Sequence, residues 1–410
     1  MRVQPTPPSS QPLPEVRVAT DADGVVGHAG LRLLTDLADR LGLTRELGRH
    51  ANAGVRRGAL DRGRVLRDLA VTLAGGGTAV SDLAVLRTQP GLFGHVASTS
   101  TAWRVLGEVG GDPAKLAGVW LALARARRRV WAHGGAPPGD GPLLVDLDGV
   151  LVDAHTPKQG AAATFKRGFG FHPLGAWLDR GDGTGEALAV VLREGRAGSN
   201  TAADHVGLLA MALAALPAGQ RRTRGVLVRC DAAGATHGLL DACRAWGARF
   251  SVGFDVTAKV RQAIAAVPCD GWVPALDSHG RPRSDAHVAE LASLELPGWP
   301  PGSRVLCRRE PATAGARASG KPVDQAGRRL QAVLTDQPDT DVAVVERRHR
   351  QHASVEIVCT QVTKLRRGAG VGGGDHVADL DLAVGHHHPV DQQFHQLAAL
   401  LEAGLVKAHP

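Results

Sequence analysis

The stretch Pro142–His155, which reads PLLVDLDGVLVDAH, decides the predicted fold of this chain. Apolar residues lead into Asp146 and Asp148, which lie two positions apart on what must be a β-strand. Side chains two positions apart on a strand point to the same face, so these carboxylates project together. Two crowded carboxylates repel each other unless a cation or a shared proton relieves them, and Mg²⁺ prefers carboxylate oxygens. The stretch therefore predicts metal-dependent chemistry on a phosphate.

The composition allows two or three domains and an anionic partner. The 410 residues include 48 Lys and Arg against 40 Asp and Glu, and this net charge of +8 suits a polyanion without proving one. The 5 cysteines are scattered without a C-x-x-C pair, so we expect no zinc site, no disulfide framework and a reducing cytoplasm. We expect no membrane span either, because no apolar run of roughly 18 residues is free of charge.

Residues 28–133 are predicted to form a helical domain, behind a disordered Pro- and Ser-rich lead-in over residues 1–27. An amphipathic stripe starts at Leu31, a second helical pattern starts at Val65, and the cluster Ser98–Thr101 offers N-caps for a third helix. Three short capped helices resemble a helix-turn-helix array, whose last helix enters the major groove. The pattern fits an ordinary helical subdomain at least equally well.

The third helix contains Arg104, and four more arginines cluster on the helix predicted over residues 114–131. Guanidinium groups spread around a helix suit DNA phosphates, which position a protein on DNA without reading its sequence. Cations also favour a helix C-terminus, so a solvated helix end explains the cluster about as well. The candidate DNA-contacting residues are Arg104, Arg125, Arg127, Arg128 and Arg129.

A different pattern begins at residue 142, after a linker rich in Gly and Pro. Residues 142–253 are predicted to form three strands, a helix, a fourth strand, a second helix and a fifth strand. This order resembles an RNase H-like fold, an α/β class with a mixed sheet and flanking helices. Asp148 lies in the first strand and Asp231 ends the fourth, and these two strands are neighbours in such a sheet. We therefore expect the two carboxylates to share an ion near the carboxyl ends of the strands.

The rest of the chain is predicted to interrupt and then complete this core. Residues 254–340 alternate short strand patterns with Pro and Gly turns, which predicts a β-rich insertion. Helical texture returns over residues 340–356, where Glu346 and Glu356 lie among arginines and histidines. Taken alone, that segment fits a charged surface helix better than a site. Only the family resemblance described next implies that residues 341–360 form the second part of the catalytic core.

Three segments carry a family resemblance: LLVDLDGVLVDAHTPKQGAAATFKRGFGFHPLGAWLDRGDGTGEALAVVLREGRAGSNTAADH, VLVRCDAAGATHGLLDAC and ERRHRQHASVE. Together they resemble DDE transposases of bacterial insertion sequences, nearest to the IS-thirteen-eighty group in its actinobacterial form. The likeness covers roughly residues 25–356 in unbroken order. It implies DNA cleavage and strand transfer at terminal inverted repeats, with two Mg²⁺ ions that Mn²⁺ can replace. It also implies a homodimer in the active complex and a location at the nucleoid in the bacterial cytoplasm.

The resemblance also assigns roles to acidic residues. The family's three catalytic carboxylates, which hold the metal ions, fall on Asp148, Asp231 and Glu356. Hard cations of this kind need oxygen ligands, and a pair of them suits in-line displacement at a phosphate. Asp146 is interpreted as a neighbour that supports the ligands, with direct ligation as the weaker alternative.

The late helix departs from the family pattern Tyr-x2-Arg-x3-Glu-x6-Lys. His349 and His352 stand at the Tyr and Arg positions, and Lys364 comes one place after the Lys position. These three residues are predicted to support the metal ligands. The likeness stops after Glu356, and residues 361–410 are rich in Gly and His, which suggests a frameshifted or decayed tail. The activity of this copy is therefore left open.

Two other interpretations remain at this point. The motif DLDGVLVD also resembles the first motif of haloacid-dehalogenase-type phosphatases, with Asp146 as nucleophile and Asp148 as acid or base. Gly374, Asp375 and Asp379 could mimic the closing motif of that class, although no apolar strand precedes them. The second alternative is a DNA-binding protein whose catalytic core has lapsed.

Overall fold

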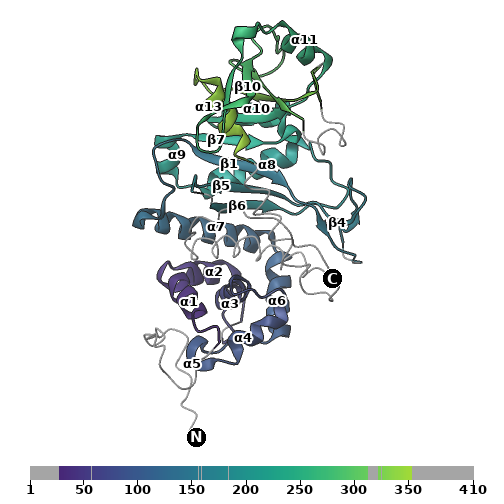
Figure 1. Cartoon of the computed structure of the whole chain (residues 1–410). Coiled ribbons are helices and arrows are strands. Elements are labelled where there is room, and N and C mark those ends of the chain that lie inside the picture. Colours follow the sequence, from purple (N-terminus) through teal and green to yellow (C-terminus); the bar gives the residue numbers. More distant parts are fainter. Residues whose placement is uncertain are drawn as a thin grey trace. The chain divides into compact units, whose positions relative to one another are not determined.

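The computed structural model describes residues 27–352, except for residues 57, 156, 158, 183, 313–321 and 325. The chain divides into two compact units, shown in Figure 1. The first, called the helical unit below, comprises residues 1–136, 156–159 and 362–410. The second, called the sheet unit, comprises residues 137–155 and 160–361.

The helical unit is built from helices, of which α3, α6 and α7 have a first turn capped by a side chain. Asp61 accepts a hydrogen bond from Gly63 N at 2.7 Å, and Ser98 accepts one from Thr101 N at 3.3 Å, as its cluster of hydroxyls predicts. The helices are α1 (Leu31–Arg40), α2 (Leu43–Ala51), α3 (Arg62–Ala74), α4 (Ala84–Arg87), α5 (Pro90–Phe93), α6 (Thr99–Gly110) and α7 (Pro113–Val130), with a 3-10 turn at Val80–Leu83 and a π-helical turn at Trp131–Gly135.

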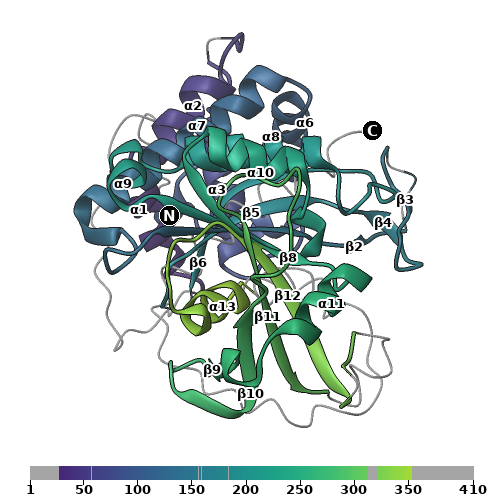
Figure 2. The ribbon, with the colours of Figure 1, turned by 90° about the horizontal axis from the view of Figure 1, so that it is seen from above.

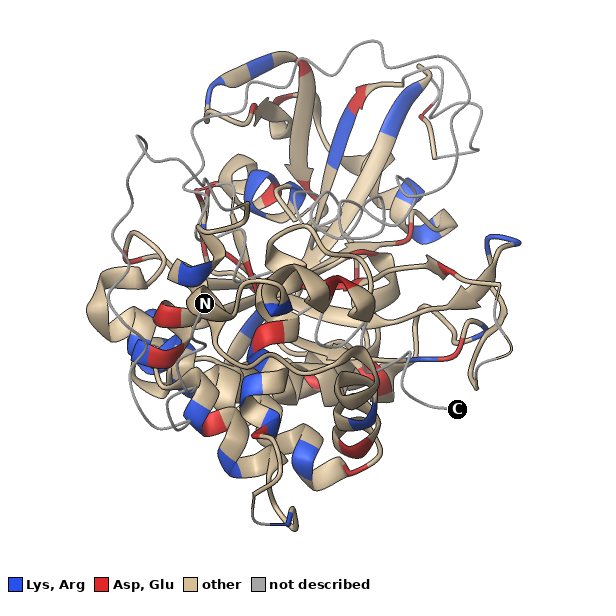
Figure 3. Ribbon diagram, turned by 90° about the horizontal axis from the view of Figure 1, so that it is seen from below, with Lys and Arg blue, Asp and Glu red and all other residues tan. Residues whose placement is uncertain are grey.

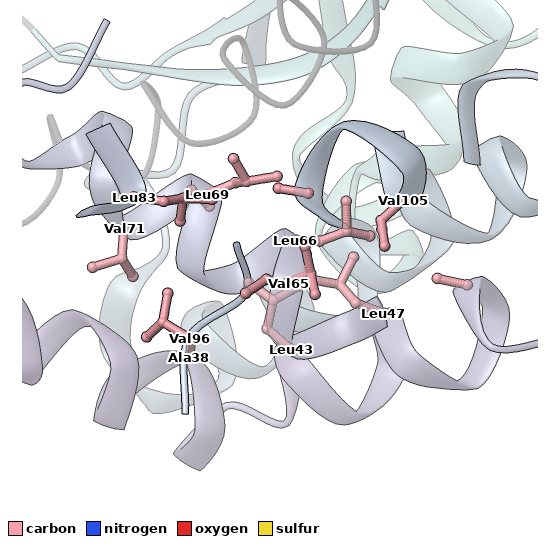
Figure 4. Close-up of a cluster of buried hydrophobic side chains, with 14 of the residues drawn as sticks. Ala38, Leu43, Leu47, Val65, Leu66, Leu69, Val71, Leu83, Val96 and Val105 are labelled. Carbon is pink, nitrogen blue, oxygen red and sulfur yellow. The ribbon is translucent and has the colours of Figure 1, made fainter. Parts of the chain in front are cut away.

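The core of this unit surrounds α3, whose side chains are buried on most faces. Figure 4 shows Leu43 and Leu47 of α2 meeting Leu66 of α3 in one apolar cluster. The two helices approach so closely that a Cβ on Gly63 would lie 2.3 Å from Gly48 N, so only glycine fits at that crossing. Burial of this cluster stabilises the unit and fixes how its helices pack.

The sheet unit is organised by a mixed sheet of nine strands. The strand order β6-β5-β1-β7-β8 opens it, with β1 antiparallel to β5 and parallel to β7. This is the strand order of an RNase H-like fold, and it confirms the predicted fold class. In spatial order the strands are β6 (Gly185–Val191), β5 (Leu174–Asp179), β1 (Leu143–Gly149), β7 (Val226–Cys230), β8 (Ala248–Phe254), β12 (Arg328–Thr335), β11 (Arg304–Pro311), β10 (Pro282–Glu290) and β9 (Val273–Leu276).

The predicted β-rich insertion extends this sheet. Beyond β8 the sheet continues with β12, β11, β10 and β9, and each of these strands pairs antiparallel with the strand before it. Of these, β10 was not predicted, because its first half is exposed and charged and gives no apolar alternation. The insertion and the core therefore share one continuous hydrogen-bonded ladder.

Helices flank the sheet, and Figure 2 shows α8 and α10 lying close together, away from α13. Helix α8 packs on β5 and β6, and α13 packs on β9, β10 and β11. The late helix was predicted over residues 340–356, but α13 begins after its N-cap Asp341 and ends at Arg350. The helices are α8 (Ala202–Ala215), α9 (Ala218–Arg224), α10 (His237–Ala245), α11 (Ala258–Ala266) and α13 (Val342–Arg350), with 3-10 turns at Ala232–Gly234 and Cys269–Gly271.

A small second sheet follows β1 in the chain and extends outward from the main sheet (Figure 2). It consists of β2 (Val152–Asp153), β4 (Phe169–Phe171) and β3 (Ala162–Ala163), in that spatial order. Among the described residues, no single helix is long and apolar enough to cross a membrane. Only α8 and α9 together pass that test of length and composition, and they are bent by 105° at their junction.

Candidate active site at the ends of β1 and β7

Two carboxylates lie together where β1 and β7 end. The strands run parallel, and their register pairs Leu147 with Cys230, so the next residue on each strand is Asp148 or Asp231. Neighbouring strands are about 4.8 Å apart. Burial raises the pKa of the Cys230 thiol well above its usual value, and the charges of Asp231 and Asp148 raise it further. Both carboxylates therefore lie within electrostatic reach of one sulfur atom.

The backbone holds Asp231 in a defined orientation. Its Oδ1 accepts a hydrogen bond from Ala233 N at 2.9 Å, which caps the 3-10 turn that follows β7. The residue is exposed at this edge, and it lines a pocket of 530 Å³ together with residues of β8, β12 and α13. Asp231 can therefore present oxygen atoms to a ligand from outside the sheet.

Asp146 has a different environment, although it is only two residues from Asp148. It is 2 % exposed and forms a bidentate ion pair with Arg229, with distances of 2.6 and 2.7 Å. Arg229 also donates to Asp179 Oδ2 and to the Arg348 carbonyl, each at 2.6 Å. Burial raises the pKa of Asp146, and the Arg229 guanidinium opposes that shift. One buried arginine thus joins β1, β5, β7 and α13.

This ion pair contradicts the phosphatase interpretation. A nucleophile must reach its substrate, and the Asp146 carboxylate is enclosed and already held by Arg229. The order of elements disagrees with it as well, because strands β2 to β6 follow β1, where a phosphatase of that class is expected to have a helix. The residues proposed for its closing motif, Gly374, Asp375 and Asp379, lie outside the described residues.

The two histidines of the late segment lie beside the aspartates. His349 is buried on α13, with Nδ1 3.2 Å from the Ser251 carbonyl oxygen, and burial lowers its pKa well below the usual value. The His352 ring lies 4.8 Å from the His349 ring, and His352 lines the same pocket as Asp231. The last described residues of the chain therefore reach this edge of the sheet. Glu356 and Lys364 lie outside the described residues.

The segment that follows β6 supplies Arg193, a residue that the sequence interpretation missed. The Arg193 side chain is 5 % exposed. Its Nε donates to the His172 carbonyl at 3.0 Å, and its Nη1 lies 3.1 Å from Asp204 Oδ2. Its Nη2 is buried and has no hydrogen-bond partner among the described residues. A buried guanidinium with an unused donor is costly, so this nitrogen is available to donate to a water molecule or to a ligand.

The unused donor faces the residue that follows Asp148. A Cβ on Gly149 would lie 3.7 Å from Arg193 Nη2 and 2.8 Å from His172 Nε2. His205 is also buried, and burial lowers its pKa. The charge of Arg193 lowers this pKa and the charge of Asp231 raises it, so His205 lies near both groups. The available signal was the segment REGRAGSN, directly after a strand and inside the family-like stretch. Arginine is abundant throughout this chain, so a single functional arginine does not stand out in the sequence.

The residues present fit part of a Mg²⁺ site. Asp148 and Asp231 lie at one edge of the sheet, and their carboxylate oxygens are of the kind that this ion prefers. Within residues 27–352, apart from the gaps given above, no three His, Cys, Asp or Glu side chains form a complete metal site. The third predicted ligand, Glu356, is not among the residues that the structure describes.

Two of the predicted DNA-contacting arginines bind inside the helical unit. Arg125 Nη1 lies 2.5 Å from Glu46 Oε2, and Arg129 bonds to the Leu41 carbonyl and approaches Glu46. The remaining candidates are Arg104 and Arg128, which are exposed, and Arg127, which is half-buried. Figure 3 shows basic and acidic residues interspersed over these helices.

Comparisons with known proteins show which family model and which solved structure the chain is similar to. The sequence matches the family described as "Transposase DDE domain group 1" over residues 9–324. No curated protein matches it. A cryo-EM structure of the piggyBac transposase synaptic complex with hairpin DNA is similar, with a TM-score of 0.40 and 9 % sequence identity. That match covers 81 % of this chain and 68 % of the other.

Proposed function

The chain belongs to the DDE transposase family, and we propose that it cleaves and rejoins DNA strands at the ends of a bacterial insertion sequence. The single observation that carries the proposal is the pair Asp148 and Asp231 at the adjacent ends of β1 and β7. In a chain of this family, such a pair supports phosphoryl transfer on DNA. The resemblance to the IS-thirteen-eighty group names the kind of element.

In the proposed mechanism, Asp148 and Asp231 hold divalent cations, with Mg²⁺ as the natural ion and Mn²⁺ as a substitute. Bound Mg²⁺ supplies Lewis acidity, which polarises the scissile phosphate and stabilises the departing oxygen. Glu356 completes the ligand set in this proposal. The approach of His352 to the pocket that Asp231 lines supports this, because Glu356 follows only a short distance along the chain.

The surrounding residues position the two aspartates and the phosphate. The Asp146–Arg229 pair braces β1 against β7, so the ends of both strands keep their register. The unused Nη2 of Arg193 is a cationic donor beside Gly149 and suits a phosphate oxygen of the DNA. Its other two nitrogens are held by backbone and carboxylate oxygens, which fixes the direction in which it donates.

The proposed partner is DNA, namely the terminal repeats and a target site. The net charge of +8 supports this, because cationic groups at the surface attract a phosphate backbone. The family resemblance adds a homodimer that holds two DNA ends together.

The deciding experiment uses a supercoiled plasmid that carries the gene with its natural flanking DNA. We expect nicking at the borders of the element in Mg²⁺ or Mn²⁺ and none in EDTA. Asp148→Asn and Asp231→Asn should each lower the rate by roughly 10³-fold or more, since metal-derived stabilisation is worth several kcal/mol. Asp241→Asn is the matched control, because this aspartate is exposed on α10. Equal cleavage by Asp148→Asn and the native chain would refute the proposal.

A second candidate function is DNA binding without cleavage. Two features of the sequence resemblance favour it: His349 and His352 stand at the family's Tyr and Arg positions, and no likeness extends past Glu356. The family model itself matches only as far as residue 324. A lapsed enzyme would retard DNA that carries the borders of the element but leave the plasmid intact in both metal ions. Border-specific nicking that disappears in Asp231→Asn would exclude this candidate.

A further inference from the structure

The turn between β3 and β4 presents three exposed residues, Phe165, Lys166 and Arg167. Hydrogen bonds close the turn: Thr164 N donates to Gly168 O at 2.9 Å, and Arg167 N donates to Thr164 O at 3.0 Å. Arg167 has a φ of 63°, a left-handed conformation that the closed turn requires. The three exposed side chains therefore lie on a defined turn, called the hairpin tip below.

The hairpin tip lies close to the strand end that carries Asp148. The Phe165 ring centroid is 5.4 Å from that of His172, and His172 Nε2 lies beside Gly149. Burial lowers the pKa of His172, and the charge of Lys166 adds to this effect, so the lysine also lies near this histidine. A chain of direct contacts thus leads from the exposed aromatic ring to the residue after Asp148.

Phe165 is 62 % exposed, and Lys166 Nζ lies 5.7 Å from the centre of its ring. A single exposed aromatic residue is ordinary on a protein surface. A ring with one cation beside it and a second on the same turn is a poor contact for another apolar protein surface, but it suits a polymer that offers aromatic faces between anionic groups. DNA has this chemistry, and base–aromatic stacking is worth about 1–3 kcal/mol per base.

The geometry of DNA restricts where such a ring can stack. Inside a duplex, both faces of each base are covered by neighbouring base pairs. An aromatic side chain therefore needs an end, a gap or an unpaired base. A reaction that breaks a strand creates such a place, and the hairpin tip lies beside the residues proposed to break it.

We propose that the hairpin tip binds the DNA substrate next to the strand break, with Phe165 stacked on an unpaired base and Lys166 and Arg167 against the flanking phosphates. This inference rests on the proposed function, because it assumes that the edge carrying Asp148 receives DNA. It assigns to β2, β3 and β4 the role of an arm that recognises unpaired DNA.

The test measures binding in EDTA, so that it is independent of cleavage. The full chain is titrated with two fluorescent probes of the same sequence: a duplex with a single-stranded 3′ extension, and a covalently closed dumbbell duplex without ends. The native chain should prefer the extended probe. Phe165→Ala should weaken binding to that probe by about 5- to 100-fold and binding to the dumbbell by less than about twofold. Phe165→Trp should preserve the preference, because indole also stacks.

The matched control is Trp246→Ala, which removes another exposed aromatic side chain, 43 % exposed, at the end of α10. It should leave both affinities unchanged. Lys166→Gln and Arg167→Gln should each flatten the salt dependence of binding by roughly one phosphate contact on the extended probe. Unchanged thermal unfolding shows that each variant is folded.

Three results would overturn the inference: no preference of the native chain for the extended probe, equal weakening on both probes by Phe165→Ala, or no weakening at all. The outcome is separable from the proposed function, which depends on nicking and on Asp148→Asn. Intact nicking with no effect of Phe165→Ala on binding removes the arm and leaves the chemistry. A stacking effect without any nicking removes the chemistry and leaves the arm.

Discussion

The two units each contain a cluster of buried charge, and the two clusters have opposite compositions. In the sheet unit, one arginine, Arg229, holds the two aspartates Asp146 and Asp179. In the helical unit, one glutamate, Glu46, meets arginines of α2 and α7. The first cluster has an excess of negative charge and the second an excess of positive charge.

The clusters also differ in what solvent can reach. Arg229 is fully buried, so its cluster serves only to join strands and α13. Glu46 is 4 % exposed, whereas its partner Arg49 is 58 % exposed and Arg125 is about one-third exposed. The carboxylate is thus enclosed while the guanidinium groups remain at the surface. The same kind of ion pair therefore joins strands and a helix in the sheet unit, whereas in the helical unit it leaves guanidinium groups exposed to solvent.

The largest expected effect tests the closed cluster. Arg229→Met removes the partner of two buried carboxylates, and the free energy of unfolding should fall by about 3–5 kcal/mol, as for other broken buried pairs. Urea unfolding measures this. Arg281→Met, which removes an exposed arginine paired with Asp277, is the control and should change stability by less than about 0.5 kcal/mol. A loss below about 1 kcal/mol for Arg229→Met would show that the cluster does not brace the sheet.

A smaller effect tests the open cluster. Glu46→Gln leaves arginines without their shared carboxylate and should cost about 2 kcal/mol, between the values for exposed and buried pairs. The hydrogen bond from Arg125 lowers the pKa of Glu46 below its usual value of 4.5. The stability that ionised Glu46 contributes is therefore fully present above about pH 4.5 and is lost as the pH falls through its lowered pKa. Urea unfolding at pH 7 and at pH 3 should show the difference between native and variant chains shrinking in acid.

The smallest effect on stability concerns Arg49. Because its side chain is mostly exposed, Arg49→Gln should change the free energy of unfolding by less than about 0.5 kcal/mol. If the open cluster binds DNA phosphates, the same variant should reduce the slope of log affinity against log salt by roughly 0.9. Glu46→Gln should act in the opposite direction and raise DNA affinity at low salt. Identical salt slopes for native chain and Arg49→Gln would place DNA binding elsewhere.

The fold could be predicted largely from local patterns. The apolar run into β1 and the Ser98 cap act within a few residues, and both were interpreted correctly. The order of elements then sufficed for the sheet, because few topologies accommodate three strands, a helix and a fourth strand. Strand β10 was missed because its exposed half has no alternation.

The site could be predicted only where the family resemblance extended. Two aspartates spaced i, i+2 gave no indication that Asp146 is held by Arg229, since that pairing depends on the register of β1 and β7. The unused donor of Arg193 could not be predicted from the sequence either. Which of its nitrogens find an acceptor depends on how three separate segments pack in the folded chain. The roles of Asp148 and Asp231 as metal ligands stay predictions.

The pairing of β8 with β12 has a consequence for biosynthesis. Phe250 and Val252 of β8 are fully buried, yet one hydrogen-bonding side of this strand is covered only by β12, which leaves the ribosome much later. During that interval the nascent chain has an unpaired strand edge, whose free N–H and C=O groups can pair with other polypeptides. Any truncation before residue 328 would make this exposure permanent, so shortened products of the gene should precipitate or be captured by chaperones.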